Sequence, residues 1–210
     1  MTLSGAGDPV REYLDALLPP EPPALAALLA EEAQRNDLQP SVGPDVGRLL
    51  ALLVRSIQAR RVLELGTSLG YSTLVLAAAL RETGGRLTSV EIRPELAEAA
   101  RAALRTAGLD AHAEVVTADA RAVLDALEGP FDLILQDSAK ALYPELAGRC
   151  VELLRPGGLL VADDALFPPR GVRADFSRPV DEYNRLVAAD PRLFTVILPL
   201  GDGVAISWKR

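Results

Sequence analysis

Cysteine and histidine are almost missing from this chain of 210 residues, which contains one of each. The single cysteine, Cys150, excludes an internal disulfide and a thiolate metal cluster. It lies in an apolar helical pattern, which predicts a buried structural thiol. The single histidine, His112, excludes a histidine-rich metal site, and we assign it no role. Together these absences exclude metal sites built on thiolates or on several imidazoles.

Long hydrophobic runs and a basic excess are also missing. No apolar run approaches the roughly 20 residues of a membrane-spanning helix. The first residues lack the charged and apolar pattern of a signal sequence, so we expect a cytoplasmic location. The chain has 22 basic and 29 acidic residues, for a net charge of −7. This balance argues against nucleic-acid and anionic-membrane partners, because binding to phosphates requires clustered lysine and arginine.

The composition is that of a folded protein, with 49% apolar and 24% charged residues. We expect one domain over 1–210, in which 1–40 form a helical extension and 41–210 a catalytic core. The pattern predicts helices over about 9–18, 23–35, 44–58, 71–81, 94–107, 119–128, 140–154 and 179–190. It predicts strands over 61–66, 86–91, 112–117, 131–136 and 158–163, followed by a hairpin of 193–198 and 204–209.

Several of these strands are nearly continuously apolar, which indicates burial on both faces. Phe131–Leu135 and Gly158–Ala162 are examples. Strands of this kind that alternate with helices are typical of a parallel sheet covered by helices on both sides. The predicted fold class is therefore α/β, a doubly wound sheet with a C-terminal antiparallel hairpin and a helical N-terminal extension.

The segment Val62–Ser72 is the most informative motif. An apolar strand runs into a turn that contains Gly66 and Gly70, a helix follows, and the next strand ends on an acid, Glu91. Glycine allows the backbone to approach a ligand closely, and an acid at this place accepts hydrogen bonds from ribose hydroxyls. The spacing is Glu-x-Gly-x-x-x-Gly, which differs from a dinucleotide fingerprint. It resembles the first motif of S-adenosylmethionine-dependent methyltransferases.

Polar residues recur at the ends of successive strands, where doubly wound sheets bind their ligands. They are Gly66–Ser72, Glu91, Asp119, Asp137 with Lys140, and Asp163 with Asp164. Three carboxylates that converge at one sheet edge repel one another unless a cation neutralises them, and oxygen ligands favour Mg²⁺, Ca²⁺ or Mn²⁺. A lysine beside such a cation has its ammonium form disfavoured and is suited to act as a general base.

The segments Phe131–Tyr143 and Gly157–Asp164 look like those of the cation-dependent O-methyltransferases, the family of catechol and caffeoyl-CoA O-methyltransferases. The similarity runs from about Val42 to the C-terminus. The resemblance implies a Rossmann-like, seven-stranded, mostly parallel sheet and a homodimer. It implies transfer of a methyl group from S-adenosylmethionine to a hydroxyl of a small, catechol-like phenolic acceptor, assisted by a divalent cation, most simply Mg²⁺.

The resemblance also implies roles for individual residues. Asp137 and Lys140 are the expected catalytic residues, with Lys140 as the base, and Asp137, Asp163 and Asp164 are the expected metal ligands. Residues expected to bind the cofactor are Val42, Glu64, Gly66, Ser72, Glu91, Asp119, Ala120 and Asp137. Among these, Glu64, Gly66 and Ser72 would surround the methionine part, Glu91 the ribose and Asp119–Ala120 the adenine.

Two positions depart from the family pattern. Position 139 is alanine, where plant and many bacterial members have a second acid, so caffeoyl-CoA-like recognition of the acceptor is not carried over. The usual Asp-Asn pair is Asp163-Asp164, and the extra carboxylate is expected to raise cation affinity and to shift preference toward Ca²⁺.

Other interpretations of these residues remain open from the sequence. Asp163 and Asp164 suit a solvated strand end, Asp137 suits a helix cap, and Lys140 suits a surface position. At the level of function, the alternatives are a cofactor-binding relative with metal-independent or lapsed catalysis, an NAD-dependent oxidoreductase and a nucleic-acid amino-methyltransferase. The second would need a Gly-x-Gly-x-x-Gly turn, and the third an Asn/Asp-Pro-Pro-aromatic run after the fourth strand. The chain has neither.

Overall fold

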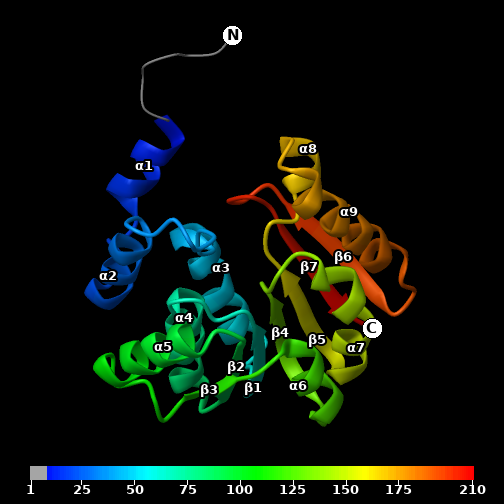
Figure 1. Ribbon diagram of the computed structural model, residues 1–210, viewed down its shortest axis with the longest axis horizontal. Coiled ribbons are helices and arrows are strands. Elements are labelled where there is room, and N and C mark those ends of the chain that lie inside the picture. Colours follow the sequence, from blue (N-terminus) through cyan, green and yellow to red (C-terminus); the bar gives the residue numbers. More distant parts are fainter. Residues whose placement is uncertain (1–8) are drawn as a thin grey trace.

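A computed structural model describes residues 9–210 and shows a seven-stranded sheet with helices on both faces (Figure 1). The strands are β1 Arg61–Leu65, β2 Arg86–Glu91, β3 Ala113–Thr117, β4 Phe131–Gln136, β5 Leu154–Ala162, β6 Leu193–Leu198 and β7 Val204–Lys209. Their order is β3-β2-β1-β4-β5-β7-β6, with β1 to β5 parallel and the last two strands antiparallel. The predicted fold class is confirmed.

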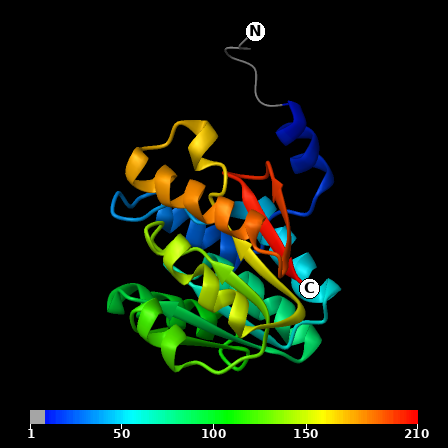
Figure 2. The same ribbon diagram turned by 90° about the vertical axis from the view of Figure 1, so that its right-hand side faces the viewer.

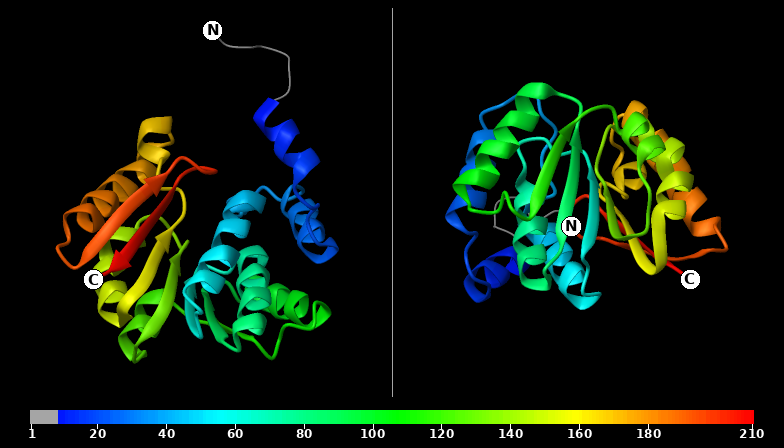
Figure 3. Two further views of the ribbon diagram at one scale, coloured as in Figure 1. Left: turned by 180° about the vertical axis from the view of Figure 1, so that it is seen from behind. Right: turned by 90° about the horizontal axis from the view of Figure 1, so that it is seen from below.

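Nine helices are present in the described residues. They are α1 Pro9–Leu17, α2 Pro23–Glu32, α3 Gly43–Ser56, α4 Tyr71–Thr83, α5 Pro94–Thr106, α6 Ala120–Ala126, α7 Leu142–Leu153, α8 Phe167–Arg170 and α9 Ala174–Ala189. Figures 1 and 3 show α3, α4 and α5 on one side of the sheet, and α6, α7 and α9 on the other. The helices after β1 and β2 thus cover one face and those after β3 and β4 the opposite face.

The continuously apolar strands supply side chains to two separate cores. In β4, Leu133 and Leu135 join the core under α3, α4 and α5, while Ile134 between them joins the core under α7 and α9. Leu159 and Leu160 of β5 divide in the same way. This alternation follows from the two-residue period of a strand. It explains why these strands have no polar face, and it confirms the prediction that both faces are buried.

The direction in which the chain crosses the sheet reverses between β1 and β4. From β1 the strand order proceeds outward through β2 and β3, and from β4 it proceeds the opposite way through β5. The loops that leave the carboxyl ends of β1 and β4 therefore diverge to opposite faces and open a crevice between them. Crevices at such a switch point are the usual ligand sites of open α/β sheets.

The N-terminal helices attach to the core side that carries α4. Leu25, Leu28 and Leu29 of α2 pack against the core as partly buried side chains, and the Tyr71 hydroxyl donates to Glu21 Oε2 at 2.6 Å. Helix α1 has no buried residue, and Figure 2 shows it projecting from the body of the molecule.

Two elements differ from the sequence-based expectation. Helix α9 begins at Ala174, five residues before the predicted start, and contains Pro179 inside it. A proline normally marks the first helical turn, which is why the sequence placed the start at 179. Strand β5 begins at Leu154, which pairs with Phe131 across a register shift. The Pro156–Gly158 run indicated a break there, but the irregular pairing accommodates it.

Cys150 is buried as predicted, and Lys209 ties the last strand to the end of α7. Cys150 is a buried free thiol, and burial raises its pKa to about 12. The ammonium group of Lys209 in β7 donates hydrogen bonds to the carbonyl oxygens of Val151 at 2.7 Å and Leu154 at 2.6 Å, which satisfies carbonyls at the end of α7.

Among residues 9–210, no helix has the length and apolar character that a membrane crossing requires.

Candidate functional site

A cavity of about 500 Å³ lies at the carboxyl ends of β1, β2 and β4. Five groups of residues line most of it: the segment 37–41, the β1–α4 turn 66–69, residues 90–93 at the end of β2, residues 118–121 after β3, and residues 137–139 after β4. Its volume lies within the range of small-molecule sites. The switch point of the sheet therefore carries a real cavity, bounded by the strand ends that the sequence singled out.

Gly66 allows the first and fourth strand ends to approach each other. Its φ is +99°, a conformation that residues with a side chain rarely adopt. A Cβ at this position would lie 2.2 Å from the carbonyl oxygen of Asp137. The backbone of the β1–α4 turn is thus in direct contact with the backbone that carries Asp137, and only glycine fits between them. Gly66 and Asp137 both line the cavity.

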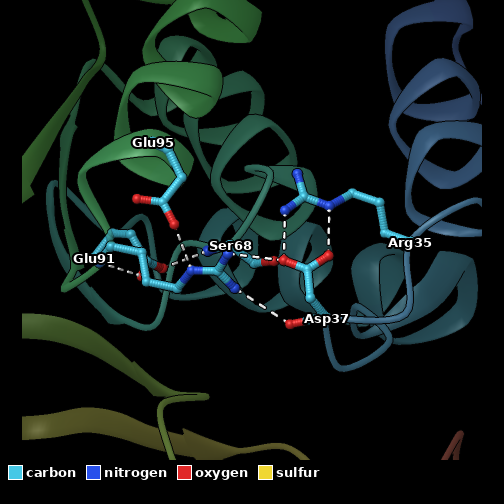
Figure 4. Close-up of polar contacts among 6 residues, drawn as sticks. Arg35, Asp37, Ser68, Glu91 and Glu95 are labelled. Atoms are coloured by element: carbon cyan, nitrogen blue, oxygen red, sulfur yellow. Dashed lines mark hydrogen bonds and ion pairs between the residues drawn. The ribbon is translucent and has the colours of Figure 1, made fainter.

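Glu91 lines the cavity at the end of β2, where two backbone groups hold its carboxylate. The N–H of Ser68 donates to Oε2 at 2.8 Å, and the N–H of Arg93 donates to Oε1 at 2.9 Å. Figure 4 shows Glu91 close to Ser68. The side chain is fixed in one orientation at the cavity wall, as a residue that accepts hydrogen bonds from a ligand needs to be.

Glu64 lies behind the cavity wall and is completely buried. Thr73 and Ser89 donate their hydroxyls to its Oε2, while Oε1 has no partner among the described residues. Burial raises the pKa of Glu64 to about 7, although hydroxyls including that of Ser72 oppose the rise. Ser72 lines the cavity, so the Ser72 side chain links Glu64 to the cavity.

The remaining predicted cofactor residues divide between wall and core. Asp119 and Ala120 line the cavity, and Asp119 also caps α6 by accepting from the N–H of Arg121 at 2.8 Å. Val42 is buried and packs into the core under α3, whereas its neighbours Gln39, Pro40 and Ser41 line the cavity. The segment that contains Val42 therefore reaches the cavity through residues just before it.

Asp137, Asp163 and Asp164 converge at the adjoining strand ends of β4 and β5. One carboxylate oxygen of each lies within 4.8 Å of the others. Asp163 is buried, and its Oδ1 has no hydrogen-bond partner among the described residues. Burial, followed by the charges of Asp137 and Asp164, raises the pKa of Asp163 well above its ordinary value. The alternative that Asp137 caps the following helix is not what the structure shows, because α7 begins after Ala141 without a side-chain cap.

Lys140 lies within this acidic cluster and not on the surface, with 2% of its area exposed. Its Nζ is 2.9 Å from Asp137 Oδ1 and 2.7 Å from Asp164 Oδ2, and it donates to the Tyr143 hydroxyl at 2.8 Å. Burial alone would lower its pKa, but Asp137, Tyr143 and Asp164 raise it well above the ordinary value. Lys140 is therefore held as an ammonium ion by its neighbours unless another cation offsets their charge.

The donor set fits a hard divalent cation. Three carboxylates meet a single ammonium group, so negative charge remains in excess, and the unpartnered Asp163 Oδ1 is a buried oxygen with free lone pairs. All candidate ligands are oxygen atoms, which Mg²⁺, Ca²⁺ and Mn²⁺ prefer. Asp137 belongs both to this cluster and to the cavity wall, so a cation here would lie beside the cavity.

Two contributions to the site were not found from the sequence. The Tyr143 hydroxyl accepts a hydrogen bond from Lys140 Nζ, a contact that the sequence did not predict. Arg93 pairs with Asp37 across the cavity rim, at 2.8 Å between Nη2 and Oδ2. The two residues are 56 positions apart, and no local pattern joins them.

Several known proteins resemble this chain in sequence and in structure. A family model described as O-methyltransferase matches residues 18–210. A catechol O-methyltransferase of Niastella koreensis is 33% identical over 94% of this chain and 95% of its own length. Among solved structures, an O-methyltransferase from Bacillus cereus in complex with S-adenosylhomocysteine has a TM-score of 0.83 at 28% identity, covering 96% of this chain and 97% of its own. TomG, an O-methyltransferase from Streptomyces achromogenes involved in tomaymycin synthesis and solved with S-adenosylmethionine, has a TM-score of 0.84 at 28% identity, covering 100% and 99%.

Proposed function

Since this chain belongs to the O-methyltransferase family and is an S-adenosylmethionine-dependent O-methyltransferase, we propose that it methylates a hydroxyl of a small catechol-like acceptor with the help of a divalent cation. The observation that carries the proposal is the position of the acidic cluster. Asp137, Asp163 and Asp164 converge beside the cavity, and Asp137 belongs to both. A cation and a methyl donor would therefore be neighbours.

The cofactor is proposed to occupy the cavity. Glu91 would accept hydrogen bonds from the ribose hydroxyls, since its carboxylate is already fixed by two backbone N–H groups. Gly66 and Ser72 would adjoin the methionine part, with Glu64 behind them, and Asp119–Ala120 would adjoin the adenine. The segment that contains Val42 would close the remaining side.

The acidic cluster is proposed to hold the cation and to present the acceptor. A divalent cation held there, Mg²⁺ or in its place Ca²⁺ or Mn²⁺, would supply positive charge that lowers the pKa of the acceptor hydroxyl. Asp137, Asp163 and Asp164 would supply the ligands. With their charge offset by the cation, Lys140 would be neutral and would accept the hydroxyl proton at Nζ. The two aromatic rings near that Nζ, Tyr143 at 4.7 Å and Phe167 at 6.0 Å, help to exclude water from this side.

A homodimer and a cytoplasmic location are retained as part of the proposal. The exposed apolar side chains Phe194, Val196 and Trp208 support the dimer. Phe194 and Trp208 are direct partners in the β6–β7 ladder, so they lie on the same face of the hairpin.

A second candidate is methyl transfer without a metal, and one contact favours it. The Lys140 ammonium group already bridges Asp137 and Asp164 and supplies positive charge where a cation would lie. In this case, the ammonium charge of Lys140 would stabilise the acceptor oxygen, and a carboxylate of the acidic cluster would accept the hydroxyl proton. A related outcome is a protein that binds the cofactor but has lost catalysis.

The decisive experiment measures transfer of a labelled methyl group from S-adenosylmethionine to a panel of catechols, with Mg²⁺, with Ca²⁺ and with EDTA. We expect EDTA to abolish transfer and Mg²⁺ to restore it. Transfer that is indifferent to EDTA would overturn the metal mechanism and favour the second candidate. Cofactor binding without transfer to any catechol would overturn the proposed acceptor class.

Lys140→Arg tests the proton acceptor in the same assay. Arginine keeps the positive charge between Asp137 and Asp164 but does not release its proton at neutral pH. We expect kcat to fall by about 10²- to 10⁴-fold, the usual contribution of a general base, with the Kd for S-adenosylhomocysteine unchanged. A kcat close to that of the unmodified enzyme would show that Lys140 is not the base.

A further inference from the structure

The segment 33–42 connects α2 to α3 and forms one side of the cavity. Residues 37–41 of this segment are lining residues. The helices at its two ends are held by other parts of the molecule, since α2 packs against the core and Val46 and Leu50 of α3 are buried in it. The segment between them is therefore a strap whose ends are fixed and whose middle faces the ligand site.

Arg93 joins this strap to the opposite rim of the cavity. Its Nη2 donates to Asp37 Oδ2 at 2.8 Å, and its Nη1 donates to the carbonyl oxygen of Asp37 at 3.2 Å. Arg35 also pairs with the Asp37 carboxylate, as Figure 4 shows. Within residues 9–210, the two bonds from Arg93 are the only hydrogen bonds or ion pairs that link the strap to the rim formed by residues 90–93.

Neighbouring groups fix the direction of the Arg93 side chain. Nε donates to Glu95 Oε1 at 2.7 Å, which leaves the two terminal nitrogens to face the strap. The backbone N–H of the same residue donates to Glu91 Oε1. The residue that braces the ribose-site carboxylate through its backbone therefore reaches across the cavity with its side chain.

We propose that Arg93 is a positioning residue that, through Asp37, holds the strap over the bound cofactor and limits the rate at which S-adenosylhomocysteine leaves. This inference rests on the proposal that the cofactor occupies the cavity. Release requires the strap to move away from the rim, and the Arg93–Asp37 contacts must break for it to do so. Asp37 forms part of the wall in this arrangement and touches no reacting atom.

The exposure of the pair sets the size of the effect. The side chains of Arg93 and Asp37 are 37% and 50% exposed, so water and salt weaken their attraction. Exposed ion pairs of this kind contribute little, and their loss corresponds to about a two- to fivefold change in a rate or equilibrium constant. A contact of this strength holds the strap closed and still permits the opening that each turnover needs.

The test is the dissociation rate constant of S-adenosylhomocysteine, measured by surface plasmon resonance on the full-length enzyme and its variants. Arg93→Ala removes the side chain but leaves the backbone bond to Glu91 in place, and Asp37→Asn removes the charge from the strap. We expect each to speed release about two- to fivefold, and the double variant to be no faster than the quicker single variant. Raising the salt concentration should speed release from the unmodified enzyme but not from Arg93→Ala.

Two control variants separate the possible failures. Arg35→Ala removes an arginine that also pairs with Asp37, at 2.6 Å, but lies on the strap itself and does not reach the opposite rim. S-adenosylhomocysteine should therefore leave this variant at the same rate as it leaves the unmodified enzyme. Glu91→Gln should raise the Kd for S-adenosylhomocysteine. A raised Kd would locate the cofactor in this cavity. Normal release from Arg93→Ala together with weak binding by Glu91→Gln would overturn the role of Arg93 alone. An unchanged Kd in Glu91→Gln would overturn the cofactor site and this inference together.

Discussion

Glu64 is a buried carboxyl group surrounded by hydroxyls. Burial raises its pKa from 4.5 to about 7, so between these values the folded protein binds a proton that the unfolded chain has released. The contribution of Glu64 to stability therefore falls as the pH rises from about 4.5 to about 7 and is constant above it. At 1.36 kcal/mol per pKa unit, the penalty at pH 8 is about 3 kcal/mol.

Glu64→Gln should remove this pH dependence, because the amide does not titrate. We expect the free energy of unfolding of the variant, relative to the unmodified protein, to improve by about 3 kcal/mol between pH 4.5 and pH 8. Urea unfolding at both pH values measures it. Asp163 and Asp164 are present in both proteins, so their titration cancels in the comparison. Two pH profiles that run in parallel would contradict the raised pKa.

At the residue scale, the sequence located the site better than it described the surroundings of each residue. The strand-end rule brought Glu91 and Asp137 to one cavity and Asp163 to the acidic cluster beside it, because the rule depends only on strand order. It could not show that Lys140 is buried among carboxylates, since burial is set by α7 and by Phe167 at the start of α8. The Arg93–Asp37 contact was missed because it depends on the path of a connecting segment.

At the element scale, the turn from β1 into α4 depends most strictly on glycine, at position 66. Gly66→Ala would place a Cβ 2.2 Å from the Asp137 carbonyl oxygen, in addition to the strain of its positive φ. Gly84, which caps the end of α4, also has a positive φ, but a Cβ there would meet no atom within 4 Å. Gly84→Ala is therefore a control that carries the backbone strain without the clash.

We expect Gly84→Ala to cost about 1–2 kcal/mol of stability, the usual cost of a left-handed conformation. Gly66→Ala should cost more, because the backbones of the β1–α4 turn and of Asp137 must separate, and it should also weaken S-adenosylhomocysteine binding. Thermal unfolding and calorimetric binding of both variants test this. Equal losses of stability would mean that the contact with Asp137 is not restrictive.

Element types were predicted well, and element ends less well. Strand β2 was predicted at its observed bounds, because its apolar run ends sharply at Glu91 and a helix with proline in its first turn follows. Helix α9 was predicted to begin at Pro179 and begins at Ala174. A local rule about proline failed there because packing of α9 against α7 and α8 extends the helix.

At the scale of the whole molecule, the topology followed from the sequence because alternating strands and helices leave few arrangements. The dimer interface does not follow from the sequence in this way, since it depends on which surfaces of the folded chain remain uncovered. Phe194 and Trp208 are 59% and 46% exposed and lie on the same face of the β6–β7 hairpin. The opposite face of that hairpin packs against α9.

We expect the unmodified protein to be a dimer and Phe194→Ser/Trp208→Ser to be a monomer, because the double change removes the aromatic part of this face. Sedimentation equilibrium measures the mass directly. Leu186→Ser is the control, since Leu186 is 46% exposed but belongs to α9. A monomeric unmodified protein, or a dimer that survives the double change, would contradict this interface.

The sequence contains only two lysines, Lys140 and Lys209, among its 22 basic residues. Nζ of Lys140 is enclosed by Asp137, Asp164 and Tyr143, and Nζ of Lys209 donates to backbone carbonyls at the end of α7. Acylating reagents react only with an accessible, neutral amine, so Lys140, which is buried and held as an ammonium ion, should be protected while the protein is folded. Acetylation at Lys140, read by mass spectrometry, would then report covalently on every event that opens the acidic cluster to solvent.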